Sequence, residues 1–191
     1  MSLSTIITKF SKNSTTIVYV DTFECPVGKA IAAADNDYLY ILTFEDSKNF
    51  EKSFDTLAKE LSCKFVESKN KVLNKFEGEL SDYFEGKLKK ITVPMKTFGS
   101  DFQKAVWDKV LELPYGSTQT YGDLARALGR PPSHSRAVGA ACGANALLLV
   151  VPCHRLIASR SKGGYNSGVD RKDKLIELEK KWSVCFKNYK Q

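Results

Sequence analysis

No stretch of this 191-residue chain is both apolar and long enough to cross a membrane. The opening segment, Met1 to Ile7, is too short for a secretory signal and lacks the usual flanks. We therefore expect a soluble, intracellular protein, located in the cytoplasm of a prokaryote or the nucleus of a eukaryote. With 42% hydrophobic residues, the chain has a globular composition and room for one substantial domain or two small ones.

Histidine is rare, and the cysteines are widely separated. The five cysteines stand at positions 25, 63, 142, 153 and 185, and His134 and His154 are the only histidines. A conventional zinc site is hard to assemble without a close cysteine pair, and the odd cysteine count favours reduced thiols. A glycine-rich phosphate loop is also missing, so the sequence predicts neither a metal nor a nucleotide cofactor.

An excess of positive charge is missing from the first half. Residues 1–92 contain 13 Lys and Arg against 14 Asp and Glu, a net charge of −1, whereas residues 93–191 contain 16 against 8, a net charge of +8. A basic region beside a neutral one is typical of proteins that bind a phosphate backbone, although many basic surfaces are only solvated. The second half is therefore the candidate nucleic-acid-binding region.

The first half has the pattern of a small α/β unit. Runs of β-type residues predict strands, and apolar residues at helical spacing, such as Phe50, Phe54 and Leu57, predict helices. The expected strands are 15–20, 28–34 and 38–44, with a turn at 35–37, and the expected helices are 47–62 and 69–86. The basic segment 87–97 is expected to connect two domains, 1–92 and 93–191.

The second half is mainly helical. Ser100 can cap a helix through residue 110, and Thr120 precedes a shorter helix over 121–128. A Gly/Pro break at 129–132 follows, and Ser133 is a candidate cap for the next helix. These two short helices form a candidate helix-turn-helix with residues 133–142 as the recognition helix. Helix pairs with glycine turns are also common in proteins that never touch DNA, so the pattern alone leaves both readings open.

The adjacent pair Cys153-His154 is the strongest chemical signal. It follows an apolar run at 147–151, and an imidazole beside a thiol can generate a thiolate nucleophile. Neighbours in an extended chain point to opposite faces, so we expect the two side chains to communicate through a turn or a bridging water. A lone buried cysteine is more often ordinary core, so the pair needs support from its surroundings.

Several motifs around this pair provide that support. They are Tyr121-Gly122-Asp123-Leu124-Ala125, Arg136-Ala137-Val138-Gly139, Asn145, Gly164-Tyr165 and Leu178-Glu179. With Pro152-Cys153-His154-Arg155, they resemble the DNA-repair O6-alkylguanine-DNA alkyltransferases. The resemblance runs from Cys25 to Glu179 and is specific from Phe102 onward. It implies an α/β fold with a small ribonuclease-H-like N-terminal domain and a mainly helical C-terminal domain that contains the helix-turn-helix.

The resemblance implies direct repair of DNA. A member of the family flips the damaged guanine out of the duplex, and a cysteine thiolate takes the alkyl group from O6 in a single, irreversible transfer; O4-alkylthymine is a further candidate substrate. The damaged DNA is itself the donor, so no cofactor is expected. The implied partner is the minor groove of double-stranded DNA containing alkylated guanine, bound by a monomer, with cooperative binding left open.

Five residues match the catalytic positions of the family. Cys153 is the nucleophile, His154 the base acting through water, and Glu179 the group that orients it. Asn145 ties the recognition helix to the active-site loop, and Tyr165 hydrogen-bonds O6 as it leaves. Glu179 also has support from spacing, because positions 175, 179 and 182 share one helix face with apolar neighbours. The alternative for Glu179 is a solvated position at the helix edge.

The remaining matches concern DNA and the pocket. Tyr121 presses on the 3′ phosphate and Arg136 fills the space left by the flipped base; core packing and a surface ion pair are the respective alternatives. The other implied DNA-binding residues are Ala137, Gly139 and Ala140, and the implied pocket residues are Cys142, Leu156, Gly163, Gly164 and Asn166. The chain has Ala146 where the family usually has proline, and Asn166 leaves the range of alkyl sizes open.

Three other functions compete with repair. A relative that recognises alkylated bases without repairing them would lack the nucleophile, yet Cys153 is present. A helix-turn-helix transcription factor would fit the basic half and leave the Cys-His-Glu set unexplained. A cysteine hydrolase would need an oxyanion site that the sequence does not announce. Mass spectrometry after mixing with a methylated oligonucleotide would separate these functions.

Overall fold

The structure, a computed structural model, describes residues 3–188 and the side chains of residues 3–184. The chain divides into two compact units: an N-terminal unit that runs through Phe98 and includes residues 146–148, and a C-terminal unit of Gly99–Asn145 and the chain from Leu149 onward. The division falls six residues beyond the predicted boundary at 92/93, because residues 94–96 hydrogen-bond the strand residue Leu39 (2.8 and 3.0 Å). Residues 146–148 join the same unit through hydrogen bonds with Leu42, both 2.8 Å.

A four-stranded mixed sheet forms the centre of the N-terminal unit. Its order is β3 (Leu39–Phe44), β2 (Gly28–Ala34), β1 (Ile17–Cys25) and β4 (Lys64–Glu67). The β1–β2 and β2–β3 pairs are antiparallel, whereas β1 and β4 are parallel. The three predicted strands are present, but β1 extends to Cys25 and the short strand β4 had not been predicted.

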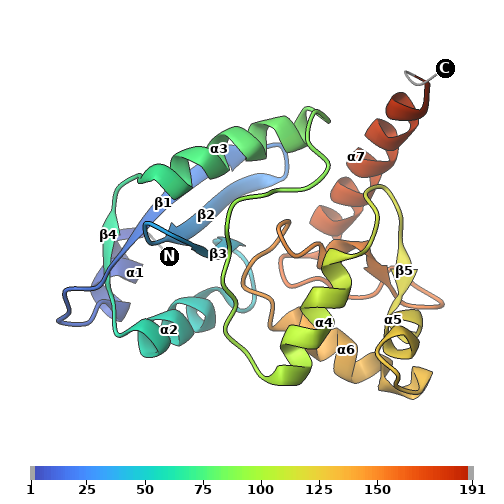
Figure 1. The fold of residues 1–191 in the computed structure, drawn as a ribbon, viewed down its shortest axis with the longest axis horizontal. Coiled ribbons are helices and arrows are strands. Elements are labelled where there is room, and N and C mark those ends of the chain that lie inside the picture. The colour runs from blue at the N-terminus through green and yellow to red at the C-terminus, as the bar shows by residue number, and fades with distance from the viewer. Residues whose placement is uncertain (1–2, 189–191) are drawn as a thin grey trace. The chain divides into compact units, whose positions relative to one another are not determined.

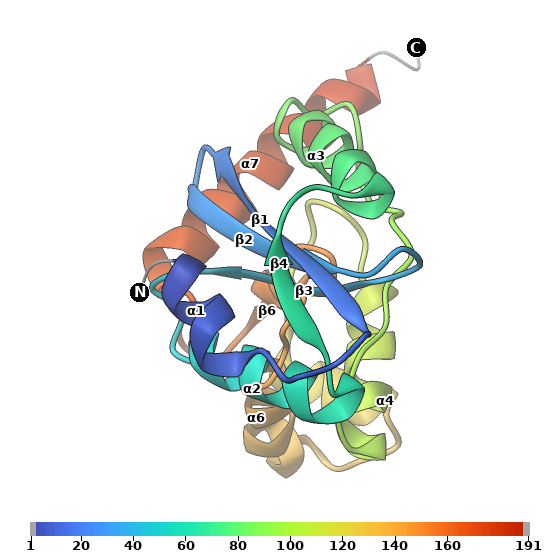
Figure 2. The ribbon, with the colours of Figure 1, turned by 90° about the vertical axis from the view of Figure 1, so that its left-hand side faces the viewer.

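Helices cover both faces of this sheet, as Figures 1 and 2 show for α3 on one side and α1 and α2 on the other. The helices are α1 (Leu3–Phe10), α2 (Phe50–Leu61) and α3 (Lys71–Phe84), and α1 had not been predicted. On the α1 and α2 face, the ring of Phe54 lies 5.5 Å from that of Phe65. On the other face, the rings of Phe23 and Phe76 meet edge-on at 5.3 Å. The sheet is therefore buried between two apolar layers.

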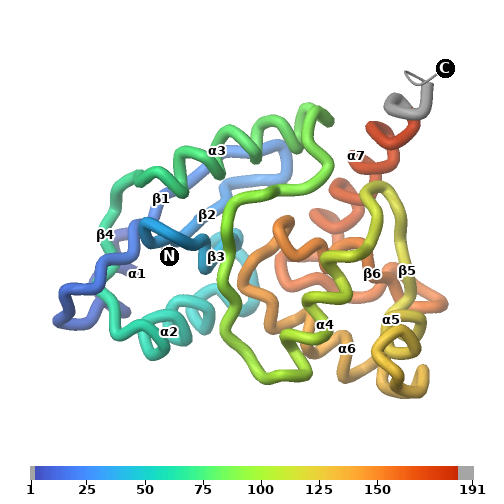
Figure 3. The backbone as a smooth tube through the Cα atoms, in the orientation of Figure 1, coloured from blue at the N-terminus to red at the C-terminus, as the bar shows by residue number. Residues whose placement is uncertain are grey.

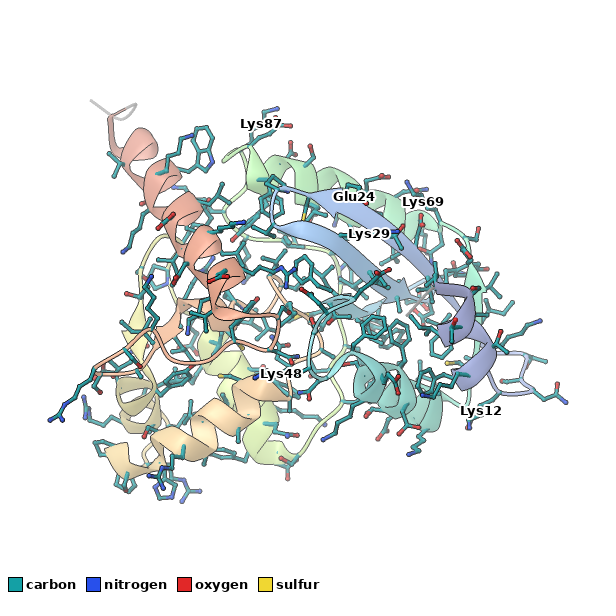
Figure 4. All side chains as sticks on the ribbon, turned by 180° about the vertical axis from the view of Figure 1, so that it is seen from behind. Lys12, Glu24, Lys29, Lys48, Lys69 and Lys87 are labelled. Atoms are coloured by element: carbon teal, nitrogen blue, oxygen red, sulfur yellow. The ribbon has the colours of Figure 1, made fainter. Side chains whose placement is uncertain are left out.

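Charged side chains lie at the periphery of the N-terminal unit. Figure 4 shows Lys12, Lys69 and Lys87 projecting from its surface, with Glu24 and Lys29 on neighbouring strands. Glu24 and Lys29 are cross-strand partners in the β1–β2 ladder. This unit therefore follows the usual pattern of apolar core and charged surface.

The C-terminal unit is mainly helical, and its backbone path is clearest in Figure 3. Its elements are α4 (Asp101–Leu111), β5 (Gln119–Thr120), α5 (Tyr121–Ala127), the 3-10 turn η1 (Pro132–His134), α6 (Ser135–Gly143), the 3-10 turn η2 (Cys153–Arg155), β6 (Leu156–Ile157) and α7 (Val169–Asn188). Capping boxes start α4 at Ser100 and α5 at Thr120. No described helix is long and apolar enough to span a membrane.

Helices α5 and α6 form the predicted helix-turn-helix, with one correction to its second helix. Ser133 does not cap α6, because it lies inside η1. The cap position belongs to His134, which makes no side-chain capping hydrogen bond. The recognition helix is therefore 135–143 rather than 133–142, since Pro131 and Pro132 favour a tight turn before it.

Candidate active site

The Cys153-His154 pair lies in a tight turn rather than an extended chain. The apolar run at 147–151 is buried, and η2 follows it directly. Only 4% of the surface of Cys153 is exposed, and none of that of His154. The backbone of Leu149, just before the turn, has the left-handed φ of 69°, a conformation that is strained for a non-glycine residue. The apolar run therefore delivers the thiol and the imidazole into the interior of the C-terminal unit.

A buried carboxylate on α7 holds the imidazole. Nε2 of His154 lies 2.8 Å from Oε1 of Glu179, and both side chains are almost fully buried. Arg155 donates from Nε and Nη2 to the same carboxylate, at 3.0 and 2.9 Å, and the backbone N–H of Gly116 donates to it at 2.9 Å. Nη1 of Arg155 donates to the carbonyl of Leu113 at 2.6 Å. Glu179 is thus a structural and electrostatic anchor for two consecutive residues of η2.

The charges in this cluster set the protonation states of Glu179 and His154. Burial opposes ionisation of Glu179, but the hydrogen bonds and positive charges of His154 and Arg155 outweigh it and lower the pKa of the carboxyl to about 2. Burial lowers the pKa of His154 against the pull of Glu179. The resting state is therefore a carboxylate beside a neutral imidazole, whose Nε2–H donates to the carboxylate.

This tautomer leaves Nδ1 of His154 as a proton acceptor. Nδ1 is buried and has no hydrogen-bond partner among the described residues. A buried, unpartnered acceptor is costly unless a ligand or water satisfies it. The imidazole is therefore oriented to receive a proton within the site.

The thiol of Cys153 is protonated at rest. Interaction with the Cys142 side chain, together with burial, raises its pKa well above the ordinary value. The side-chain amide of Asn145 and the positive charge of Lys172 act in the opposite direction. Nδ2 of Asn145 lies 3.4 Å from Sγ of Cys153 and 3.0 Å from the carbonyl oxygen of Val151. Asn145 therefore links the end of α6 to the active-site turn.

Tyr165 presents a second buried atom without a partner. Its hydroxyl is fully buried and has no hydrogen-bond partner among the described residues. Its ring meets that of His154 edge-on at 6.5 Å. Burial raises the pKa of Tyr165 strongly, with a further contribution from Cys153. The hydroxyl therefore keeps its proton and is available as a hydrogen-bond donor.

The segment 162–164, which contains two glycines predicted to line the substrate pocket, is held by two side chains. Lys172 is completely buried, and its Nζ donates to the carbonyls of Lys162 (2.6 Å) and Gly164 (3.1 Å). The hydroxyl of Tyr121 donates to the same Gly164 carbonyl at 3.2 Å. Gly163 has φ of +70°, and a Cβ there would lie 2.9 Å from the Tyr121 ring. This segment therefore needs glycine at position 163.

The sequence prediction missed Lys172 and gave no role to Arg155. Helical spacing could have identified the lysine, because positions 172, 175 and 179 lie on one face of α7. Burial lowers the pKa of Lys172 to about 8, and its polar partners are backbone carbonyls rather than a carboxylate. Burying a cation without a carboxylate partner lowers the stability of the fold, so we infer that Lys172 is kept for organising the site.

The remaining predicted residues divide into an exposed group on α6 and a buried group. Arg136, Ala137 and Ala140 are exposed on α6, and no heavy atom comes within 4 Å of a Cβ placed on Gly139, so this side of the helix is open. Leu156 and Asn166 are buried. The described residues contain no cluster of three or more side chains suited to a metal.

Comparisons with known proteins match both halves of the chain to one family. Residues 18–97 match the ribonuclease-like domain of 6-O-methylguanine DNA methyltransferase, and residues 101–181 match its DNA-binding domain. The methylated-DNA–protein-cysteine methyltransferase of Methanosarcina acetivorans is 37% identical over 163 residues, which are 85% of this chain and 98% of the relative. The inducible enzyme of that name from Bacillus subtilis is 40% identical over 145 residues, 74% of this chain and 80% of the relative.

A solved structure shares the fold. The crystal structure of Mycobacterium tuberculosis OGT in complex with DNA superposes with a TM-score of 0.73 at 31% identity, and covers 86% of this chain and 94% of that one. The predicted family and α/β fold class are confirmed. This chain belongs to the methylated-DNA–protein-cysteine methyltransferase family.

Proposed function

We propose that this protein repairs DNA by accepting one alkyl group, from O6 of an alkylated guanine, on Sγ of Cys153. The observation that carries the proposal is the buried set of Cys153, neutral His154 and ionised Glu179. Family membership supports the same chemistry, because the matched relatives are named for transfer to a protein cysteine.

The proton follows a short path. His154 accepts the thiol proton at Nδ1 through a bridging water, and the resulting imidazolium is stabilised by Glu179, 2.8 Å from Nε2. The hydrogen bond from Asn145 and the charge of Lys172 favour the thiolate once it forms. The nucleophile is thus generated inside the pocket instead of being exposed as a permanent thiolate.

The thiolate then displaces guanine from the alkyl carbon. The S–C bond forms as the C–O6 bond breaks, and the electron pair of that bond passes to the purine. The hydroxyl of Tyr165 donates a hydrogen bond to O6 as negative charge develops there. The proton held by His154 neutralises the guanine, so thiol and alkylguanine become thioether and guanine. A thioether is a poor leaving group, and each molecule therefore acts once.

We infer that the protein works on DNA as an intracellular monomer. The exposed small residues of α6 allow close approach to the minor groove, and the C-terminal region supplies the positive charge. Arg136 fills the vacated stack and Tyr121 presses on the neighbouring phosphate while the base rotates. The matched Mycobacterium tuberculosis structure contains DNA, which supports DNA as the partner.

The test is a stoichiometric transfer experiment. The protein is mixed with excess duplex oligonucleotide containing O6-methylguanine, and intact-mass and peptide mapping follow the alkyl group. We expect one methyl group per molecule, on Cys153, and none transferred by Cys153→Ser. Cys25→Ser, which removes a thiol of the N-terminal unit, serves as the matched control and should react normally. Turnover beyond one equivalent, or labelling of another cysteine, would refute the proposal.

Base flipping is tested by comparing two substrates. Arg136→Ala should slow transfer from duplex DNA strongly and leave reaction with free O6-benzylguanine nearly unchanged, because a free base needs no extrusion. Affinity for undamaged duplex should change little, since many phosphate contacts contribute. Arg130→Ala, at another exposed arginine outside α6, is the control. Equal losses on both substrates would assign Arg136 to the pocket or the fold.

A further inference from the structure

Arg155 is a buried cation to which the proposed chemistry assigns no step. It follows His154 in η2, and only 6% of its surface is exposed. The ring of Tyr115 packs over its guanidinium, with Cζ 5.6 Å from the ring centroid. Replacing a buried ion pair by apolar residues is often neutral or stabilising for a fold. Stability alone therefore does not explain an arginine at this position.

The guanidinium meets the Glu179 carboxylate in a forked contact. Nη2 lies 2.9 Å from Oε1, and Nε lies 3.0 Å from Oε2 and 3.2 Å from Oε1. Nη1 donates to the carbonyl of Leu113 at 2.6 Å, so the guanidinium is held on both sides. A forked contact fixes the plane of a carboxylate as well as its distance. Oε1 of Glu179 is thereby directed at Nε2 of His154, 2.8 Å away.

Two basic groups share the single negative charge of Glu179. Arg155 already balances that charge, so the imidazole of His154 needs no proton to neutralise the cluster. A neutral residue in place of Arg155 would leave a buried carboxylate facing the imidazole alone, and an uncompensated buried charge is strongly unfavourable. The imidazole would then take up a proton. Burial lowers the pKa of His154, Glu179 raises it, and the positive charge of Arg155 lowers it further.

The imidazole has charged and polar neighbours on several segments. Glu179 and Lys172 act on it from α7, and Arg155 acts from the same turn. The neighbouring Cys153 thiol and the Tyr165 hydroxyl carry their protons at rest, so neither adds a charge. Lys172 donates to backbone carbonyls, whereas Arg155 is hydrogen-bonded to the carboxylate that holds the imidazole. The arginine is therefore the cation placed to set how strongly this carboxylate attracts a proton to the imidazole.

We propose that Arg155 is a positioning residue for alkyl transfer: by orienting and neutralising Glu179, it keeps His154 an uncharged base that can accept the thiol proton of Cys153. The inference rests on the proposed function, because it concerns the step in which that proton moves. With the arginine in place, the imidazolium forms only during the reaction and loses its proton to the departing purine. Without the arginine, His154 is protonated before the substrate arrives and cannot accept the thiol proton.

The first measurement follows the protonation of His154 by NMR. The chain contains two histidines, so labelling with ¹⁵N-histidine gives two sets of imidazole signals, which His134→Asn, at an exposed position, assigns. In the unchanged protein we expect the neutral Nε2–H form at neutral pH. In Arg155→Met we expect an imidazolium that loses its proton only at higher pH. Lys180→Met, which removes an exposed positive charge of α7, should leave the His154 signals unchanged.

The second measurement is the pH profile of single-turnover transfer from free O6-benzylguanine. Arg155→Met should react about tenfold or more slowly at neutral pH and recover toward the unchanged rate as the pH rises to about 9, because only the neutral imidazole accepts the thiol proton. Arg155→Lys keeps the charge and loses the fork. Its profile should have the unchanged shape at a lower rate. A merely structural role would lower the rate of Arg155→Met by the same factor at every pH.

Three outcomes would overturn the proposal for Arg155. They are a His154 that stays neutral at neutral pH in Arg155→Met, a pH profile of that variant parallel to the unchanged one, and an imidazolium at neutral pH in the unchanged protein. Arg155→Gln replaces the methionine variant if circular dichroism shows that protein to be misfolded, and the NMR titration of the unchanged protein needs no variant. Failure of the repair function would look different, because the protein would then accept no alkyl group at any pH while NMR still reports the protonation of His154.

Discussion

The two units bury different kinds of side chain. The N-terminal unit buries aliphatic and aromatic residues, and its buried polar residues in the described chain are Thr43 and Ser47. The C-terminal unit buries Asn145, His154, Arg155, Asn166, Ser167, Lys172 and Glu179, including every buried charged residue described. Apolar burial stabilises a fold, whereas buried charges cost desolvation energy. The difference indicates that the C-terminal unit gives up stability for an organised, buried reaction site.

The largest expected effect concerns the buried carboxylate. Glu179→Gln should slow alkyl transfer by about 10² to 10⁴-fold, because it removes the charge that stabilises the imidazolium of His154. Breaking the pair with Arg155 should also lower the free energy of unfolding by about 3–5 kcal/mol. Single-turnover kinetics with O6-benzylguanine and urea denaturation measure the two effects. Glu177→Gln, at an exposed position of the same helix, is the matched control; equal behaviour of the two variants would contradict the role of Glu179.

A core truncation in the other unit should separate stability from chemistry. Phe54 is fully buried against Phe10, Phe50 and Phe65. Phe54→Ala should lower the free energy of unfolding by about 3–5 kcal/mol through the cavity it creates. Thermal denaturation measures this loss. The folded fraction should transfer alkyl groups at the normal rate, and a slowed rate per folded molecule would show that the N-terminal core also shapes the site.

Replacing Lys172, the buried cation, should slow alkyl transfer without lowering the free energy of unfolding, the reverse of the Phe54 result. Lys172→Met keeps the volume and removes the charge, so the free energy of unfolding should stay the same or increase. Transfer should slow by up to about 10²-fold, because the segment 162–164 loses its hydrogen bonds to Lys172 and the substrate is positioned less accurately. Parallel denaturation and kinetic measurements give both quantities. Lys174→Met, at an exposed position, is the control, and unchanged kinetics in Lys172→Met would remove the lysine from the mechanism.

The smallest effect is the pH dependence due to His154. Its folded pKa lies below the unfolded value of about 6.5, so the unfolded chain binds the proton first as pH falls. The free energy of unfolding should therefore decrease below pH 6.5, by at most about 1.4 kcal/mol per pH unit. Ionised Glu179, whose folded pKa is about 2, stabilises the folded state above about pH 4.5, and this stabilisation is lost between about pH 4.5 and 2. The range from pH 6.5 to 5 therefore isolates the effect of His154. Denaturation at several pH values should show this slope, and His154→Asn should lose it.

Local chemistry explains why much of the molecule was predictable. The capping residues Ser100 and Thr120 act on backbone groups three residues away, so sequence alone reveals them. Glu179 could be placed on the buried face of α7 from helical spacing. The roles assigned by resemblance to Arg136 and Tyr121 on DNA remain predictions, because DNA-bound geometry depends on the partner.

Sequence by itself determined the elements, the acceptor thiol and its neighbouring imidazole, because these depend on periodicity, capping and adjacency. Only the tertiary structure decided which distant residues meet. It paired β1 with β4, placed residues 146–148 beside β3, buried Lys172 against the carbonyls of residues 162 and 164, and brought Glu179 to His154. The physical reason is that each of these contacts depends on the packing of separate segments, and their burial changes protonation in a way that no local pattern encodes.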